Sequence, residues 1–396
     1  GDAINSVTVK EDLTFTGTLD ETVSTSIDTS VTLTIAASKV SGKAVTGTGS
    51  LIIEALAADT DLANVNPGGG VTARVGADLD ITDNAFLGDV DIYEVSSGST
   101  LRATGAQLNG KTVLGDGSLI VERLVGGTDL TNVNPGGGVT ALVADNISIT
   151  GNGTLGVVDT YTVSTNRTLT ATADQVDGIA VNGEGRLTVN GTATGATDLS
   201  SLSADVVDIT GADLTNGSVT WMTVAAGDEL RLTSGQATGQ TILAAENASA
   251  VITVSGLAGD ANLTNIGNAT ATVNATVTGS IDITGNVHLG KVDTYTVSSG
   301  FTLTALASQV NGLTVVAAGT GNIAVTALHA TPAANLSGLT SASGTVTAAF
   351  DASGTFTGNL GTAVVTVADS AVMTAAASDV AGKTINKFNT GALAVT

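Results

Sequence analysis

One ten-residue segment occurs six times in this sequence, for example as Leu169-Thr-Ala-Thr-Ala-Asp-Gln-Val-Asp-Gly178. Each copy begins with Leu or Met and ends with Gly. The copies cover residues 33–42, 101–110, 169–178, 230–239, 303–312 and 373–382. Their final glycines are 68, 68, 61, 73 and 70 residues apart. A recurrence at this period indicates a repeat protein.

Two further markers recur in the same order. An Asp-Leu or Asn-Leu pair begins at residues 61, 129, 198, 262 and 335, and an alternating stretch such as Ile147-Ser-Ile149-Thr begins at residues 13, 79, 147, 207 and 281. We therefore interpret residues 1–396 as one continuous array. Its approximate repeats are 19–86, 87–154, 155–218, 219–288 and 289–360, with partial repeats at 1–18 and 361–396.

Apolar and polar residues alternate within each repeat, as in Asp159-Thr-Tyr161-Thr-Val163. This period of two is typical of half-buried β-strands, and Gly, Asn and Asp separate the strands as turn residues do. The stretch 171–178 and its relatives could form one helical turn that ends at glycine.

The predicted fold is all-β: a β-solenoid, similar to a parallel β-helix, built from units of about 68 residues. The alternative is a string of small β-sandwich domains. A free-standing sandwich of this size buries little surface, and this chain has 3% aromatic residues and no cysteine to stabilise it. Small aliphatic residues and Thr suit the narrow interior of a solenoid, so we favour the solenoid.

Composition argues against several functions. Acidic residues outnumber basic ones 36 to 13, giving a net charge of −23. This excess disfavours nucleic acid and anionic lipid as partners, and no apolar stretch is long enough for membrane insertion. Cysteine is absent and the two histidines, His288 and His329, are far apart in sequence. We expect no enzyme activity and no cofactor.

The residues that we expect to matter most are structural. The glycines that end the six segments should adopt the left-handed conformation at turns: Gly42, Gly110, Gly178, Gly239, Gly312 and Gly382.

One strand position carries an aromatic residue in four repeats: Tyr93, Tyr161, Trp221 and Tyr295. Two interpretations stay open. The rings pack between turns of the solenoid, or they form a row of platforms that contact glycans.

Aspartates are frequent at the turns, and calcium is bound by clustered oxygen ligands of this kind. The calcium-binding nonapeptide Gly-Gly-x-Gly-x-Asp is absent from the sequence, however. Asx turns are the simpler interpretation, and the question of a metal is left open.

The blocks Thr302-Leu-Thr-Ala-Leu-Ala-Ser-Gln-Val-Asn-Gly312-Leu-Thr-Val and Ala333-Ala-Asn-Leu-Ser-Gly-Leu339 resemble those of large bacterial β-strand-repeat surface proteins, which are adhesin-like or S-layer-like. The resemblance implies an extracellular or cell-surface location. We therefore expect a structural subunit of a filament, sheath or surface layer that self-associates, head to tail or laterally, through uncapped solenoid ends or edges. The alternative is a stalk or glycan-binding segment of a cell-surface adhesin.

Overall fold

The computed structural model describes residues 6–17, 24–153, 155–156, 158–246, 249–268 and 270–396. It is all-β, with parallel strands stacked into a β-solenoid of about 19 turns, which confirms the predicted fold. The chain divides into two compact units, residues 1–190 and 191–396, which we describe separately. The division falls inside the repeat expected at 155–218.

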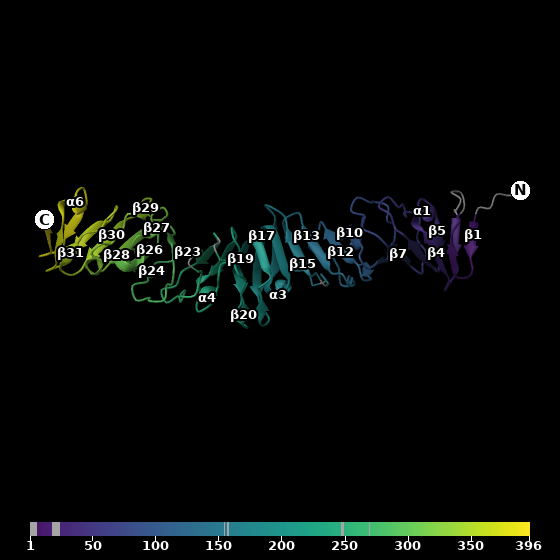
Figure 1. Ribbon diagram of the computed structural model, residues 1–396, viewed down its shortest axis with the longest axis horizontal. Coiled ribbons are helices and arrows are strands. Elements are labelled where there is room, and N and C mark those ends of the chain that lie inside the picture. Colours follow the sequence, from purple (N-terminus) through teal and green to yellow (C-terminus); the bar gives the residue numbers. More distant parts are fainter. Residues whose placement is uncertain (1–5, 18–23, 154, 157, 247–248, 269) are drawn as a thin grey trace. The chain divides into compact units, whose positions relative to one another are not determined.

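The first unit consists of short parallel strands and three one-turn helices (Figure 1). The elements that begin in it are β1 (Ser6–Val9), β2 (Leu13–Phe15), β3 (Ser24–Ile27), β4 (Thr32–Ala36), α1 (Ala37–Val40), β5 (Val45–Gly47), β6 (Ser50–Glu54), β7 (Val71–Val75), β8 (Leu79–Asp80), β9 (Ile92–Val95), β10 (Thr100–Thr104), α2 (Gly105–Leu108), β11 (Thr112–Leu114), β12 (Ser118–Glu122), β13 (Val139–Val143), β14 (Ile147–Ser148), β15 (Thr160–Val163), β16 (Thr168–Thr172), α3 (Ala173–Val176) and β17 (Ala180–Thr192).

The second unit repeats this organisation. Its elements are β18 (Thr197–Asp198), β19 (Leu202–Asp213), β20 (Val219–Thr220), β21 (Glu229–Thr233), α4 (Ser234–Ala237), β22 (Val251–Ser255), β23 (Thr272–Val277), β24 (Ile281–Asp282), β25 (Thr294–Val297), β26 (Thr302–Leu306), α5 (Ala307–Val310), β27 (Thr314–Ala317), β28 (Asn322–Thr326), η1 (Leu328–Ala330), β29 (Leu339–Ser341), β30 (Val346–Phe350), β31 (Gly354–Phe356), β32 (Val364–Val367), β33 (Val372–Ala375), α6 (Ala377–Val380), β34 (Ile385–Lys387) and β35 (Ala392–Val395).

The sequence repeat is longer than a whole number of turns. In the first unit, β4, β6, β7 and β9 stack in register, and three turns take the chain from Leu33 to the position of Asp91, 58 residues later. Ten more residues lead to Leu101, which is the equivalent of Leu33 but stacks on Leu79 in the next column of strands. Each repeat therefore comprises three turns plus one side of the solenoid.

The second unit follows the same rule. Three turns take the chain from Leu230 to Asp293, 63 residues later, through β21, β22, β23 and β25. Ten residues further on, Leu303 stacks on Ile281 in another column. Because the ten-residue step is constant, the variation in repeat length arises within the turns.

The core is a set of ladders of small and branched apolar side chains. In the column of β4, residues Ile35, Ile53, Ala73, Tyr93 and Val113 lie in register on successive turns, and each of them is at most 1% exposed. Such dense packing of aliphatic side chains provides the main stabilisation, since burial of apolar surface contributes about 25 cal/mol per Å².

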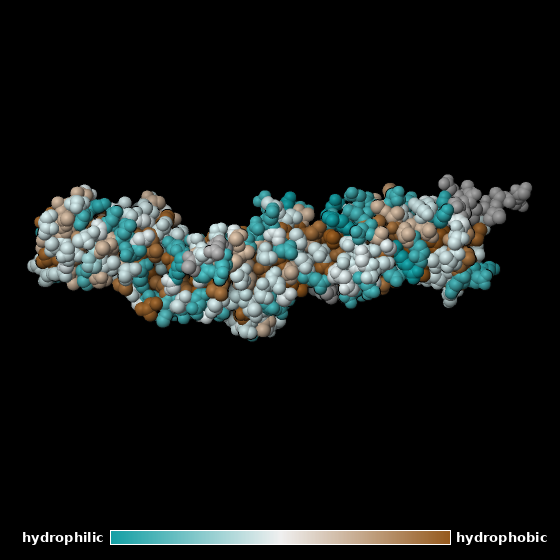
Figure 2. All heavy atoms as spheres, viewed as in Figure 1, coloured by the Kyte–Doolittle hydropathy of each residue, from teal (hydrophilic) through white to brown (hydrophobic). Residues whose placement is uncertain are grey.

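The surface carries few charges. On the face shown in Figure 2, residues of intermediate hydropathy predominate, with hydrophilic and hydrophobic residues scattered among them. None of the helices in the described part of the chain combines the length and apolarity needed to cross a membrane.

Candidate functional site

Each of the six predicted turn glycines lies two residues beyond a one-turn helix, which confirms the expected helical turn. The φ angles of the six glycines lie between 67° and 74°. A Cβ added at any of them would meet no atom within 4 Å. Glycine is therefore required by the left-handed backbone rather than by lack of space. The six are Gly42, Gly110, Gly178, Gly239, Gly312 and Gly382.

A glutamine inside four of these helices links one turn of the solenoid to the preceding one. In α3, Gln175 Oε1 accepts a hydrogen bond from the Thr172 backbone N–H at 2.9 Å. Its Nε2 donates to the carbonyls of Ile149 at 2.6 Å and Asn152 at 3.0 Å. Equivalent bonds are made by Gln107, Gln236 and Gln309. We call these four residues the corner glutamines.

The sequence analysis did not single out the corner glutamines, although a signal was present. Each of them stands three residues before a turn glycine, and Thr104, Thr172 and Thr233 precede theirs by three residues. This Thr-x-x-Gln spacing is that of a capping box, in which the two side chains bond to each other's backbone N–H. All three threonines accept the expected bond from the glutamine N–H.

An aspartate two residues before the aromatic position was missed as well. Asp159 Oδ2 accepts a hydrogen bond from the Val139 N–H at 2.7 Å, while the Asp159 N–H donates to the Val139 carbonyl. Asp91 and Asp293 bond in the same way to Val71 and Val273. These carboxylates join the first residue of a strand to the following turn.

Three of the four aromatic residues are part of the core. Tyr93, Tyr161 and Tyr295 are 1%, 2% and 1% exposed. Each lies in register with an alanine of the preceding turn, namely Ala73, Ala141 and Ala275, so a small residue leaves room for the large ring. Burial raises the pKa of Tyr161 and that of Tyr295 to about 12, and raises the pKa of Tyr93 further.

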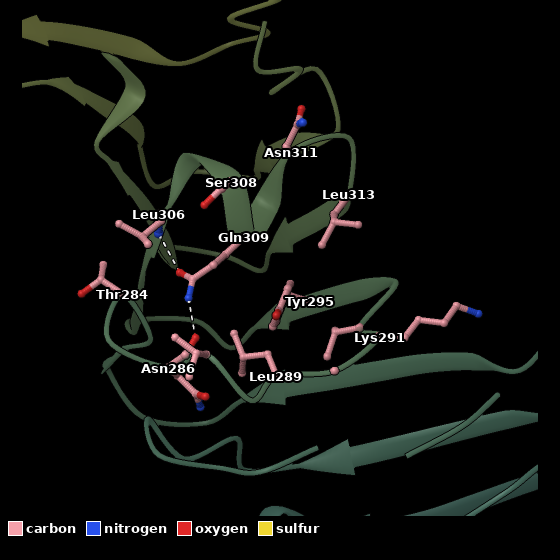
Figure 3. Close-up of a pocket in the computed structure, with 13 residues that line it drawn as sticks. Thr284, Asn286, Leu289, Lys291, Tyr295, Leu306, Ser308, Gln309, Asn311 and Leu313 are labelled. Atoms are coloured by element: carbon pink, nitrogen blue, oxygen red, sulfur yellow. Dashed lines mark hydrogen bonds between the residues drawn. The ribbon is translucent and has the colours of Figure 1, made fainter. Parts of the chain in front are cut away.

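A shallow pocket recurs beside each of these tyrosines. At Tyr295 it has a volume of about 430 Å³. Figure 3 shows Leu289 beside the ring, and Gln309 bonded to Leu306 on one side and Asn286 on the other. Residues at the same seven repeat positions line the pockets at Tyr93, of about 320 Å³, and at Tyr161, of about 710 Å³.

The aromatic positions do not form a row along one face. Within the first unit, Tyr93 belongs to the column of β4, whereas Tyr161 belongs to the column of β10. The step of one side per repeat produces this displacement. Since the rings of Tyr93, Tyr161 and Tyr295 are buried, they offer no face to a sugar. Trp221 is partly exposed, and a glycan contact remains a prediction for this residue.

The aspartates of the Asp-Leu marker form Asx turns. Asp129 Oδ1 accepts bonds from the N–H and hydroxyl of Thr131 at 3.0 and 2.7 Å, and these bonds lower the pKa of Asp129. Asp61 and Asp198 bond similarly to the residue two positions on. In the described ranges no three His, Cys, Asp or Glu side chains gather in a group that could hold a metal ion.

Comparison with known proteins adds no name to this geometry. No family model, curated protein or solved structure matches the chain.

Proposed function

We propose that this chain is a structural subunit of an extracellular filament, sheath or surface layer. The observation that carries the proposal is the use of the recurring polar side chains. The corner glutamines and the aspartates at positions 91, 159 and 293 are engaged in bonds that tie one turn to the next. A repeated arrangement of this kind supports a mechanical role, because each added turn is held to its neighbour by the same bonds.

The low proportion of charged residues, 12%, and the absence of cysteine support a location outside the cell. The resemblance to bacterial surface proteins supports it as well. A second role, as a stalk or glycan-binding segment of an adhesin, is supported by Trp221 alone among the four aromatic positions.

We further propose that copies of the chain associate through strand edges. Among the described residues, β35 pairs with β33 along one edge. Phe388 and Val395 are 60% and 55% exposed in this region. An unpaired strand edge is a template for another strand, and a strand from a second copy would cover these side chains.

Electron microscopy of the purified 396-residue chain tests this proposal, first with millimolar calcium and then with a chelator. We expect filaments or sheets with a regular axial repeat in at least one condition. Val395→Lys should abolish them, because a charged side chain on an edge strand opposes pairing. Val316→Lys is the matched control, since Val316 is 42% exposed in β27, which pairs on both edges. Single particles in both conditions would reject the proposal.

A further inference from the structure

The fourth repeat departs from the others at its aromatic position, although its backbone corresponds to theirs. Gln236 donates to the carbonyls of Ile209 and Ala212, as Gln175 does to those of Ile149 and Asn152. Trp221 follows Ile209 by twelve residues, and Tyr161 follows Ile149 by twelve. The two stretches can therefore be compared position by position.

Three apolar residues around the tyrosine become polar around the tryptophan. Leu155 and Val158, which are 8% and 5% exposed, correspond to Thr215 and Ser218, which are both exposed. In the other two tyrosine pockets the same positions hold the buried residues Leu87, Val90, Leu289 and Val292.

The third exchange is at the pocket rim. Ile179 and Leu313 line the pockets of Tyr161 and Tyr295, and Gln240 occupies the equivalent place beside Trp221. The fourth repeat thus lacks the apolar cover that buries the ring elsewhere.

Trp221 lines a pocket of about 480 Å³ together with these three polar residues. Trp221 Nε1 donates to Gln240 Oε1 at 2.9 Å, which holds the indole and the amide together. The Gln240 Nε2 group and the Ser218 hydroxyl can both bond to a ligand. Every residue that lines the pocket is uncharged.

We propose that this pocket binds a neutral hexose residue of a glycan. An indole offers a large apolar surface with a polar edge, which suits the C–H face of a pyranose ring, and the hydroxyl and amide groups at the rim suit its equatorial hydroxyls. A few placed polar groups around an apolar surface are typical of small-ligand sites. The net charge of −23 disfavours acidic sugars. This site is independent of the proposed structural role.

Trp221 is the only tryptophan in the sequence, so its fluorescence reports on this pocket directly. The full chain is titrated with cellohexaose, maltohexaose, mannohexaose and N-acetylchitohexaose, each to about 10 mM. We expect a saturable change in emission with at least one of them, with a dissociation constant of about 1 mM or lower. Gln240→Ala should weaken that binding about tenfold, since it removes a rim donor and frees the indole.

The decisive variant restores the apolar cover. The triple change Thr215→Leu, Ser218→Val and Gln240→Ile recreates the surroundings of Tyr161, and binding should be lost while the far-ultraviolet circular dichroism is kept. Tyr161→Phe is the matched control and should bind as the unaltered chain does. The proposal is overturned if none of the four sugars gives a saturable change, or if the triple variant binds as tightly as the unaltered chain. Either result is independent of whether filaments form.

Discussion

The corners at α1 and α3 have the same backbone but different side-chain bonds. Val40 and Val176 are both fully buried, and the glycines that follow, Gly42 and Gly178, have φ angles of 73° and 67°. A buried valine and a left-handed glycine therefore accompany the corner in both places.

The two corners differ at the glutamine position. In α3, Gln175 makes three hydrogen bonds to backbone groups. In α1 the same position is Lys39, and the residue before the helix, Ala36, makes no side-chain capping bond. The comparison teaches that the corner forms without the glutamine, whose contribution is the connection to the preceding turn.

The largest effect should be common to both corners. Gly178→Val and Gly42→Val each place a β-branched residue at positive φ, which costs about 2–3 kcal/mol. Urea unfolding followed by circular dichroism measures the loss. Gly178→Asn is the control and should cost less, because Asn tolerates the left-handed region. Equal stability of Gly178→Val and the unaltered chain would show that the corner does not need glycine.

The next effect should separate the corners. Gln175→Ala removes three backbone bonds and should lower the free energy of unfolding by about 2 kcal/mol, whereas Lys39→Ala should change it by less than about 0.5 kcal/mol. Amide hydrogen exchange adds a local readout. Faster exchange should be confined to residues near Ile149 and α3. A similar loss in the two variants would remove the distinction drawn between the two corners.

The smallest effect would sharpen the comparison. Lys39→Gln should stabilise α1 by at most about 1 kcal/mol, because the amide can accept a bond from the Ala36 N–H. The precedent is Gln309, which accepts from the Leu306 N–H at 2.8 Å although leucine provides no side-chain cap. Thermal unfolding of Lys39→Gln beside Lys39→Ala measures this gain. A gain equal in both variants would attribute it to the loss of the lysine instead.

Much of the fold could be predicted from the sequence, because period-two alternation and fixed glycine spacing are local signals. The solenoid and the helical turn before Gly178 follow from them. The relation between repeat and turn could not, since the stacking of Leu101 on Leu79 rather than in the column of Leu33 is a matter of hydrogen-bond register.

The candidate site was less accessible to sequence reasoning. The role of Gln175 depends on carbonyls 23 and 26 residues earlier, which only the stacking brings within reach. The burial of Tyr161 depends on the small size of Ala141 one turn earlier. The difference between Trp221 and the tyrosines was visible in the sequence, but its meaning required the pocket residues to be matched by position.

The extra side in every repeat gives each position an azimuth as well as a height. Within a compact unit, moving one repeat along the chain changes the direction in which an equivalent residue faces, as Leu33 and Leu101 show. Deleting a single whole repeat would therefore re-aim every downstream feature around the axis while leaving each local corner intact. Repeat number in this architecture specifies orientation together with length.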